Sequence, residues 1–123
     1  MANLSLERLA RLGEIANNDP QFLEYGRRFR GDLAIRCGSE QGTLRIDGGR
    51  ITGVSLNWSP EAPIRLAGEE TNWQTLWRGM PGGLHRAWRH RMIHFDGDPQ
   101  AVYGYWKMIW RLGDLMVDAG WGE

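Results

Sequence analysis

Residues 62–98 constrain the fold more than any other part of the chain, because they predict a fixed order of elements. Residues 63–67 predict a strand. Residues 69–77 predict a short helix that Gly79 ends, since glycine accepts the backbone conformation that closes a helix. A second helical piece follows, and residues 92–96 predict another strand. Strands separated by short helices in this way favour a sheet with helices packed on it.

The N-terminal part of the chain predicts two helices. Apolar residues recur at helical spacing within residues 4–17, and Asp19 followed by Pro20 is typical of the start of a second helix. Positive side chains near the C-terminal end of a helix interact favourably with the negative end of its dipole. Three residues are suited to that position in the second helix: Arg27, Arg28 and Arg30.

Residues 31–58 have an alternating pattern that predicts strands. Apolar and polar side chains alternate within residues 33–37, 43–47 and 51–58, as expected of half-buried strands. Residues 47–49, Asp-Gly-Gly, join the last two runs and predict a tight turn, because glycine tolerates positive φ. The last two runs are therefore expected to be paired strands.

The C-terminal part predicts one long helix. Asp98 and Pro99 are suited to its first turn. An apolar stripe continues to about Ala119, and Gly120 ends the helix. The whole pattern predicts one domain over residues 1–123 with an α+β fold, in which a mostly antiparallel sheet of five strands is covered by helices.

Composition and charge exclude several functional classes. Fifteen Lys and Arg balance fifteen Asp and Glu, so no long-range field draws the chain to nucleic acid or to an anionic membrane. The single cysteine, Cys37, excludes an internal disulfide framework and favours a reducing, cytoplasmic location. The N-terminal residues lack the apolar run of a secretory signal. No stretch is long enough to span a membrane, so the protein is not expected to be embedded in one.

Four segments in a fixed order carry a family resemblance. They are the turn at residues 47–49, the strand at 63–67, the helix with Trp-Gln-Thr-Leu-Trp-Arg-Gly at 73–79, and the strand that runs into Gly-Asp at 92–98. This order resembles the sterol carrier protein family over roughly residues 29–119. The resemblance implies a sheet and helices that enclose an apolar cavity for fatty acyl groups, acyl-CoA or sterols. It implies no catalytic residues.

The resemblance places an aromatic-rich set of side chains around that cavity. Aromatic and methionine side chains dominate many ligand pockets, although the same residues could form ordinary core. The face with Trp106 and Trp110 could instead be a subunit interface of a homodimer. The expected ligand-binding residues are Trp73, Leu76, Trp77, Met80, Trp88, Phe95, Tyr105, Trp106, Ile109 and Trp110.

A basic cluster lies between the second helical piece and the last strand. Arg86, Arg89 and Arg91 could hold the carboxylate or phosphate head group of a ligand, because a guanidinium pairs with such anions through two hydrogen bonds. The alternative is a solvated face that balances Asp96 and Asp98.

The histidines and the remaining acidic residues offer little chemistry. His85, His90 and His94 cross an expected change from helix to strand, so they are not expected to converge on a metal ion, and no cofactor is expected. His94 and Asp96 are candidates for acid–base catalysis, because residues two apart on a strand share a face. No other catalytic residue is indicated.

The main hypothesis is a binding or carrier protein for a hydrophobic small molecule, acting alone or for a partner enzyme. The ligand would be a lipid, a fatty acyl group or acyl-CoA, a sterol or a polycyclic intermediate. Burial drives such binding, at about 25 cal/mol per Å² of apolar surface. The alternatives are a small enzyme that acts on a bound hydrophobic metabolite, and a scaffold or dimerisation module.

Overall fold

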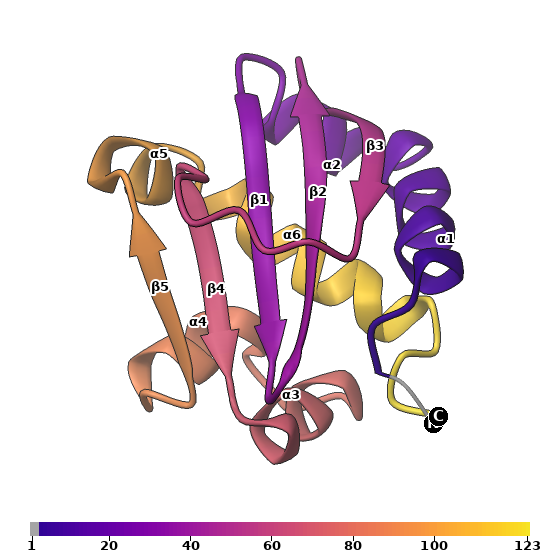
Figure 1. Ribbon diagram of the computed structural model, residues 1–123, viewed down its shortest axis with the longest axis vertical. Coiled ribbons are helices and arrows are strands. Elements are labelled where there is room, and N and C mark those ends of the chain that lie inside the picture. The colour runs from indigo at the N-terminus through magenta and orange to yellow at the C-terminus, as the bar shows by residue number, and fades with distance from the viewer. Residues whose placement is uncertain (1–2) are drawn as a thin grey trace.

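A five-stranded sheet forms the front layer of the molecule, and most of the helices pack behind it (Figure 1). The computed structural model describes residues 3–123. Neighbouring strands pair antiparallel, except that β1 and β4 are parallel. The expected α+β class and mostly antiparallel sheet are therefore confirmed. In the spatial order of the sheet, the strands are β3 (Arg50–Ser55), β2 (Glu40–Asp47), β1 (Arg30–Cys37), β4 (Ile64–Gly68) and β5 (Ile93–Gly97).

The helices begin where the sequence offers caps or prolines. Ser5, Asp19 and Asp98 accept hydrogen bonds from backbone N–H groups at the starts of α1, α2 and α5, which satisfies donors that a helix leaves free. The helices in the described residues are α1 (Leu6–Asn17), α2 (Pro20–Tyr25), α3 (Glu70–Trp77), α4 (Gly83–Arg89), α5 (Pro99–Gly104) and α6 (Trp106–Asp118).

The prediction of one long C-terminal helix is wrong, because the chain breaks it into α5 and α6 at Tyr105. Tyr105 has φ −116° and ψ 29°, outside the helical region. Gly104 weakens the helix just before the break, since glycine has low helix propensity. The ring of Tyr105 packs edge-on against Phe29, with the ring centroids 4.9 Å apart. The break therefore lets α5 cover the end of the sheet while α6 crosses behind it.

The strand predicted at residues 51–58 ends earlier, at Ser55. The chain then leaves the sheet, and the carbonyl of Asn57 accepts a hydrogen bond of 2.6 Å from the hydroxyl of Thr43. Trp58 lies in the connection that follows, and the guanidinium of Arg36 in β1 stacks over its ring at 4.1 Å. The connection between β3 and β4 therefore passes over the face of the sheet opposite the helices.

An ion pair fixes α2 against α6. Arg111 donates two hydrogen bonds, of 2.9 and 2.8 Å, to the two carboxylate oxygens of Asp19. Asp19 also accepts a bond of 2.8 Å from the backbone N–H of Phe22, and its side chain is 12% exposed. The Arg111 hydrogen bond lowers the pKa of Asp19, and the same contact raises the pKa of Arg111. This pair holds in place the helix that borders the candidate site.

Among residues 3–123, no helix is both long enough and apolar enough to cross a bilayer.

Candidate functional site

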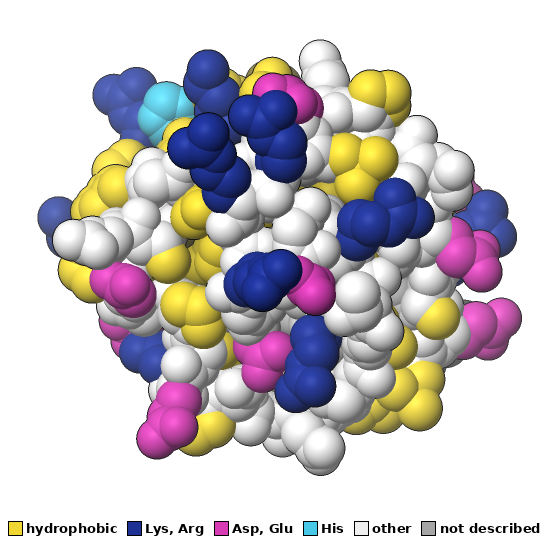
Figure 2. Space-filling view, turned by 90° about the horizontal axis from the view of Figure 1, so that it is seen from above, with side chains coloured by type: hydrophobic (Ala, Val, Ile, Leu, Met, Phe, Trp, Pro, Cys, Tyr) yellow, Lys and Arg dark blue, Asp and Glu magenta, His cyan; other side chains and the backbone are white. Residues whose placement is uncertain are grey.

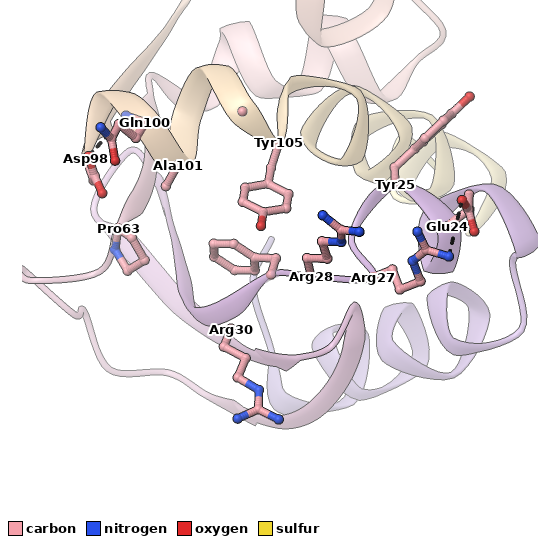
Figure 3. Close-up of a pocket in the computed structure, with 12 residues that line it drawn as sticks. Glu24, Tyr25, Arg27, Arg28, Arg30, Pro63, Asp98, Gln100, Ala101 and Tyr105 are labelled. Carbon is pink, nitrogen blue, oxygen red and sulfur yellow. Dashed lines mark hydrogen bonds and ion pairs between the residues drawn. The ribbon is translucent and has the colours of Figure 1, made fainter.

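A surface groove of about 720 Å³ opens at the upper end of the sheet, between the end of α2 and the start of α5 (Figure 3). Its floor contains Phe29 and Tyr105, the edge-on pair that accompanies the break between α5 and α6. Phe29 is only 3% exposed, so the floor continues into the core. We call this feature the α2–α5 groove; its lining is Glu24, Tyr25, Arg27, Arg28, Phe29, Arg30, Pro63, Asp98, Gln100, Ala101, Gly104 and Tyr105.

The turn after α2 explains why arginines surround an aromatic floor. Gly26 is buried so closely against Met108 that a Cβ would lie 2.6 Å from its sulfur atom. The backbone N–H of Phe29 donates to the carbonyl of Gly26 at 2.8 Å, which closes the turn. Arg27 and Arg28 therefore project into solvent while Phe29 points into the core.

The opposite wall depends on a close backbone approach at the end of β5. Gly97 has φ +121°, and a Cβ on it would overlap the carbonyl oxygen of Pro63. The same carbonyl accepts a hydrogen bond of 2.9 Å from the backbone N–H of Asp98, which starts α5. Glycine at this position therefore allows β5, α5 and Pro63 to meet at the edge of the groove.

The arginines at the rim differ in how they are paired. Arg27 lies 4.0 Å from Glu24, and Arg30 lies 2.8 Å from Asp47. Arg28 makes no ion pair and no side-chain hydrogen bond with any residue in the range 3–123, and its side chain lies beside Tyr105 (Figure 3). The view from this end shows Lys and Arg side chains spread among exposed hydrophobic ones (Figure 2). The guanidinium of Arg28 is therefore available to an anion above an apolar floor.

Four of the ten expected ligand-binding residues lie within the core. The indole N–H of Trp73 donates to the carbonyl of Arg36 at 2.8 Å, and that of Trp77 points to the sulfur of Met116 at 3.3 Å. Each indole therefore has its polar atom satisfied within the protein. The four residues are Trp73, Leu76, Trp77 and Ile109, all at most 2% exposed.

Tyr105 is the expected ligand-binding residue that lines the α2–α5 groove, and Met80 is half-buried at the edge of the core. The other four expected residues, Trp88, Phe95, Trp106 and Trp110, come together at one cluster with His85. Trp106 lies at its centre, with ring centroids 4.9 Å from Trp88, 5.0 Å from Phe95 and 5.7 Å from His85. Trp110 packs against His85 at 5.0 Å. We call these five side chains the aromatic cluster; whether they contact a ligand stays a prediction.

The basic residues expected to hold a head group surround the aromatic cluster. Arg86, Arg89 and Arg91 are exposed. None of them forms an ion pair within the part of the chain that the structure describes. Asp96 lies 3.3 Å from Arg65 and Asp98 caps α5. Whether the three arginines hold a head group or form a solvated face stays a prediction.

The suggested catalytic pair lies in solvent. His94 and Asp96 do share a face of β5, but both are exposed. The pKa of Asp96 is lowered, first by the hydrogen bond from the backbone N–H of Gly97 and then by Arg65. His94 borders an open hollow beside Trp88 and Phe95, whereas Asp96 does not line it. Residues 3–123 contain no group of three His, Cys, Asp or Glu placed to hold a metal ion.

The sequence interpretation missed the rim of the groove. It assigned the arginines that follow Tyr25 to the last turn of α2, and that assignment is wrong, because α2 ends at Tyr25 and its last turn holds no basic residue. The signal that could have indicated their position is the run Arg-Arg-Phe-Arg at residues 27–30, in which one apolar residue interrupts three basic ones.

Comparison with known proteins identifies the fold. No family profile and no curated protein sequence matches the chain. The crystal structure of sterol carrier protein 2 superposes with a TM-score of 0.80 at 14% identity, over 93% of this chain and 96% of that one. A protein from Thermus thermophilus, described as possibly a sterol carrier protein, gives 0.77 at 14% identity, over 94% and 87% of the two chains.

A third solved structure is the palmitated SCP2L2 protein from Aedes aegypti. It gives a TM-score of 0.55 at 15% identity, over 92% of this chain and 95% of that one. Each of these superpositions covers more than 90% of this chain. The chain therefore has the fold of sterol carrier protein 2.

Proposed function

We propose that the protein binds and carries a hydrophobic molecule with an anionic head group, and that the α2–α5 groove receives the head group. The observation that carries this proposal is the unpaired guanidinium of Arg28 beside the aromatic floor of Phe29 and Tyr105. An arginine without a protein partner can give its hydrogen bonds to a carboxylate or phosphate. The adjoining aromatic rings offer apolar surface to the rest of the same molecule.

The size of the groove fits a small molecule. Its volume of about 720 Å³ lies within the usual range for ligand sites, roughly 300–1,000 Å³. Apolar contact contributes about 25 cal/mol per Å² of surface buried, before the entropic cost of association. Because Phe29 is only 3% exposed, the floor offers limited apolar area, and the head-group contact with Arg28 supplies much of the affinity as well as the orientation.

The structural neighbours support a hydrophobic ligand. Two of them are named or described as sterol carrier proteins, and another is described as palmitated. The ligand class for this chain is accordingly a fatty acyl compound or a similar amphipathic acid. The enzyme alternative has no comparable support, because His94 and Asp96 are both exposed to solvent and only His94 borders a hollow.

The test is calorimetric titration with laurate and with dodecanol, which have the same chain length and differ in charge. Arg28→Gln should weaken laurate binding roughly tenfold or more, since a hydrogen bond to a charged group contributes about 1.5–3 kcal/mol. The same variant should leave dodecanol binding unchanged. The matched control is Arg50→Gln, which removes an exposed arginine outside the groove.

Two results would contradict the proposal. One is the absence of saturable binding of either compound. The other is equal loss of laurate affinity in Arg28→Gln and Arg50→Gln, which would mean that overall charge and not the groove attracts the acid.

A further inference from the structure

One segment of this neutral chain carries positive charge with no acidic residue to balance it. Residues 71–95 contain four arginines, all three histidines and no Asp or Glu, although the whole chain has zero formal net charge. The segment includes α4 and leads into β5, at the opposite end of β5 from the groove. Three of the four arginines, Arg86, Arg89 and Arg91, border the aromatic cluster.

Large aromatic rings are exposed in the same place. Trp88 and Trp110 are each 36% exposed, which is unusual for side chains with so much apolar area. Two hollows flank Arg89: one of about 340 Å³ reaches Trp110, and one of about 530 Å³ reaches Trp88 and Phe95. The surface thus alternates cationic groups with exposed indoles. We call Trp88, Trp110, Arg86, Arg89 and Arg91 the α4–β5 patch.

We propose that the α4–β5 patch docks the protein on the surface of an anionic lipid bilayer. Indole rings are favoured at the boundary between head groups and acyl chains, because they combine a broad apolar ring with one N–H donor. Arginines beside them can pair with lipid phosphates, and each basic side chain near an anionic surface contributes about 1 kcal/mol. The patch presents indoles and arginines on one face. Docking on a bilayer surface uses both kinds of side chain, whereas binding of a small soluble anion needs only the arginines.

The geometry of the rings favours a bilayer over single-stranded nucleic acid. Bases bind by stacking on open aromatic faces. In the aromatic cluster, Trp106 meets Trp88 at 71° and His85 at 90°, and Trp110 meets His85 at 66°. These edge-to-face contacts occupy ring surface that stacking would need.

Charge also disfavours a second copy of the chain as the partner. A symmetric dimer through the α4–β5 patch would bring the arginines of two copies together without acidic partners, and like charges across an interface are unfavourable. An anionic bilayer supplies the missing negative charge. A chain with zero net charge has no long-range attraction to membranes. At physiological salt, however, charges interact appreciably only over about 8 Å, so the local charge of the patch determines the electrostatic attraction to a bilayer.

The test is flotation with phosphatidylcholine vesicles that contain either about 30% phosphatidylserine or none, in about 0.15 M salt. The protein should float with the anionic vesicles only. Arg86→Gln/Arg89→Gln should reduce this partitioning roughly 25-fold, the product of two contributions of about fivefold each. The control, Arg11→Gln/Arg50→Gln, changes the net charge equally at exposed sites outside the patch and should bind like the unmodified protein.

Four outcomes would overturn the proposal. They are no flotation with anionic vesicles, equal loss in both double variants, tighter patch-dependent binding to an oligonucleotide than to vesicles, and a dimer that the patch substitutions dissociate. Thermal unfolding checks that the variants are folded, and none of the substituted arginines has an ion-pair partner in residues 3–123. The laurate titration reports on the groove independently, so either proposal can fail alone.

Discussion

Removing the carboxylate of Asp19 should destabilise the protein more than any other single change at a polar residue discussed above. Asp19 has two roles in the structure. It caps α2 through the backbone N–H of Phe22, and it accepts both hydrogen bonds of Arg111 from α6. The variant Asp19→Ala removes both, whereas Asp19→Asn keeps a capping side chain and removes the charge.

The size of the effect follows from these contacts. Loss of an N-cap costs about 1 kcal/mol, and loss of charge-assisted hydrogen bonds to a partly buried arginine costs about 2 kcal/mol. The sum, about 3 kcal/mol for Asp19→Ala, corresponds to a fall in Tm of roughly 12 °C for a chain of this length. Asp19→Asn should cost about 2 kcal/mol, because the cap remains.

Urea unfolding followed by circular dichroism measures the free energy of unfolding of each variant. In the double-mutant cycle with Arg111→Ala, the coupling energy should be at least about 1 kcal/mol. A cost below about 1 kcal/mol for Asp19→Ala, or a coupling energy near zero, would refute the reasoning.

The pH dependence gives a second check on the same pair. The folded protein lowers the pKa of Asp19 below its usual value of 3.8, so the unfolded chain takes up the proton first as the pH falls. The stabilisation is therefore fully present above the unfolded pKa and is lost as the pH falls through the folded pKa. The stability difference between the unmodified protein and Asp19→Asn should be constant near neutral pH and should shrink below about pH 4. A difference that does not change with pH would contradict this assignment.

Two further substitutions and one thiol reaction test the structure elsewhere. Gly97→Ala should cost about 3 kcal/mol or prevent folding, because a Cβ would overlap the Pro63 carbonyl and φ is +121°. Gly79→Ala, with φ +94° but open space, should cost about 1 kcal/mol in the same urea titration, and equal costs would contradict the predicted overlap. Burial raises the pKa of the Cys37 thiol to about 12, so at pH 8 its reaction with Ellman's reagent should be more than about a thousandfold slower in the folded protein than in urea. Reaction at similar rates in both states would contradict the buried position.

The sequence predicted the elements well where hydrophobic spacing alone determines them. Leu33 and Ile35 are two residues apart, between the polar Asp32 and Arg36, and are both fully buried in β1, as this spacing indicates. Ala34, between them, is also buried. Alternation could not indicate this, because the cover on the second face comes from the connection that carries Trp58, far along the chain.

The candidate site was harder to predict because it joins distant segments. Arg28 and Phe29 looked like the end of a helix, since nothing near them in the sequence indicates an aromatic partner. That partner, Tyr105, becomes available only because the C-terminal helix breaks beside it. Two aromatic residues of the predicted site, Trp88 and Trp106, lie in contact, but this contact depends on how α4 packs on α6, which spacing along the chain does not indicate.

The parallel pairing of β1 with β4 divides the sheet into two parts, β3–β2–β1 and β4–β5. The two parts differ in the length of chain that must close before their strands can pair. β1, β2 and β3 follow one another through short turns, so their pairing needs only local contacts and closes quickly. β4 can join β1 only after residues 38–63 have looped back, and β5 is linked to the rest of the sheet only through β4. We therefore expect β1, β2 and β3 to pair before β4 and β5 join them, so that the segment with the basic, aromatic surface gains its support late. Until then its exposed indoles and unpaired strand edges make the chain vulnerable to aggregation.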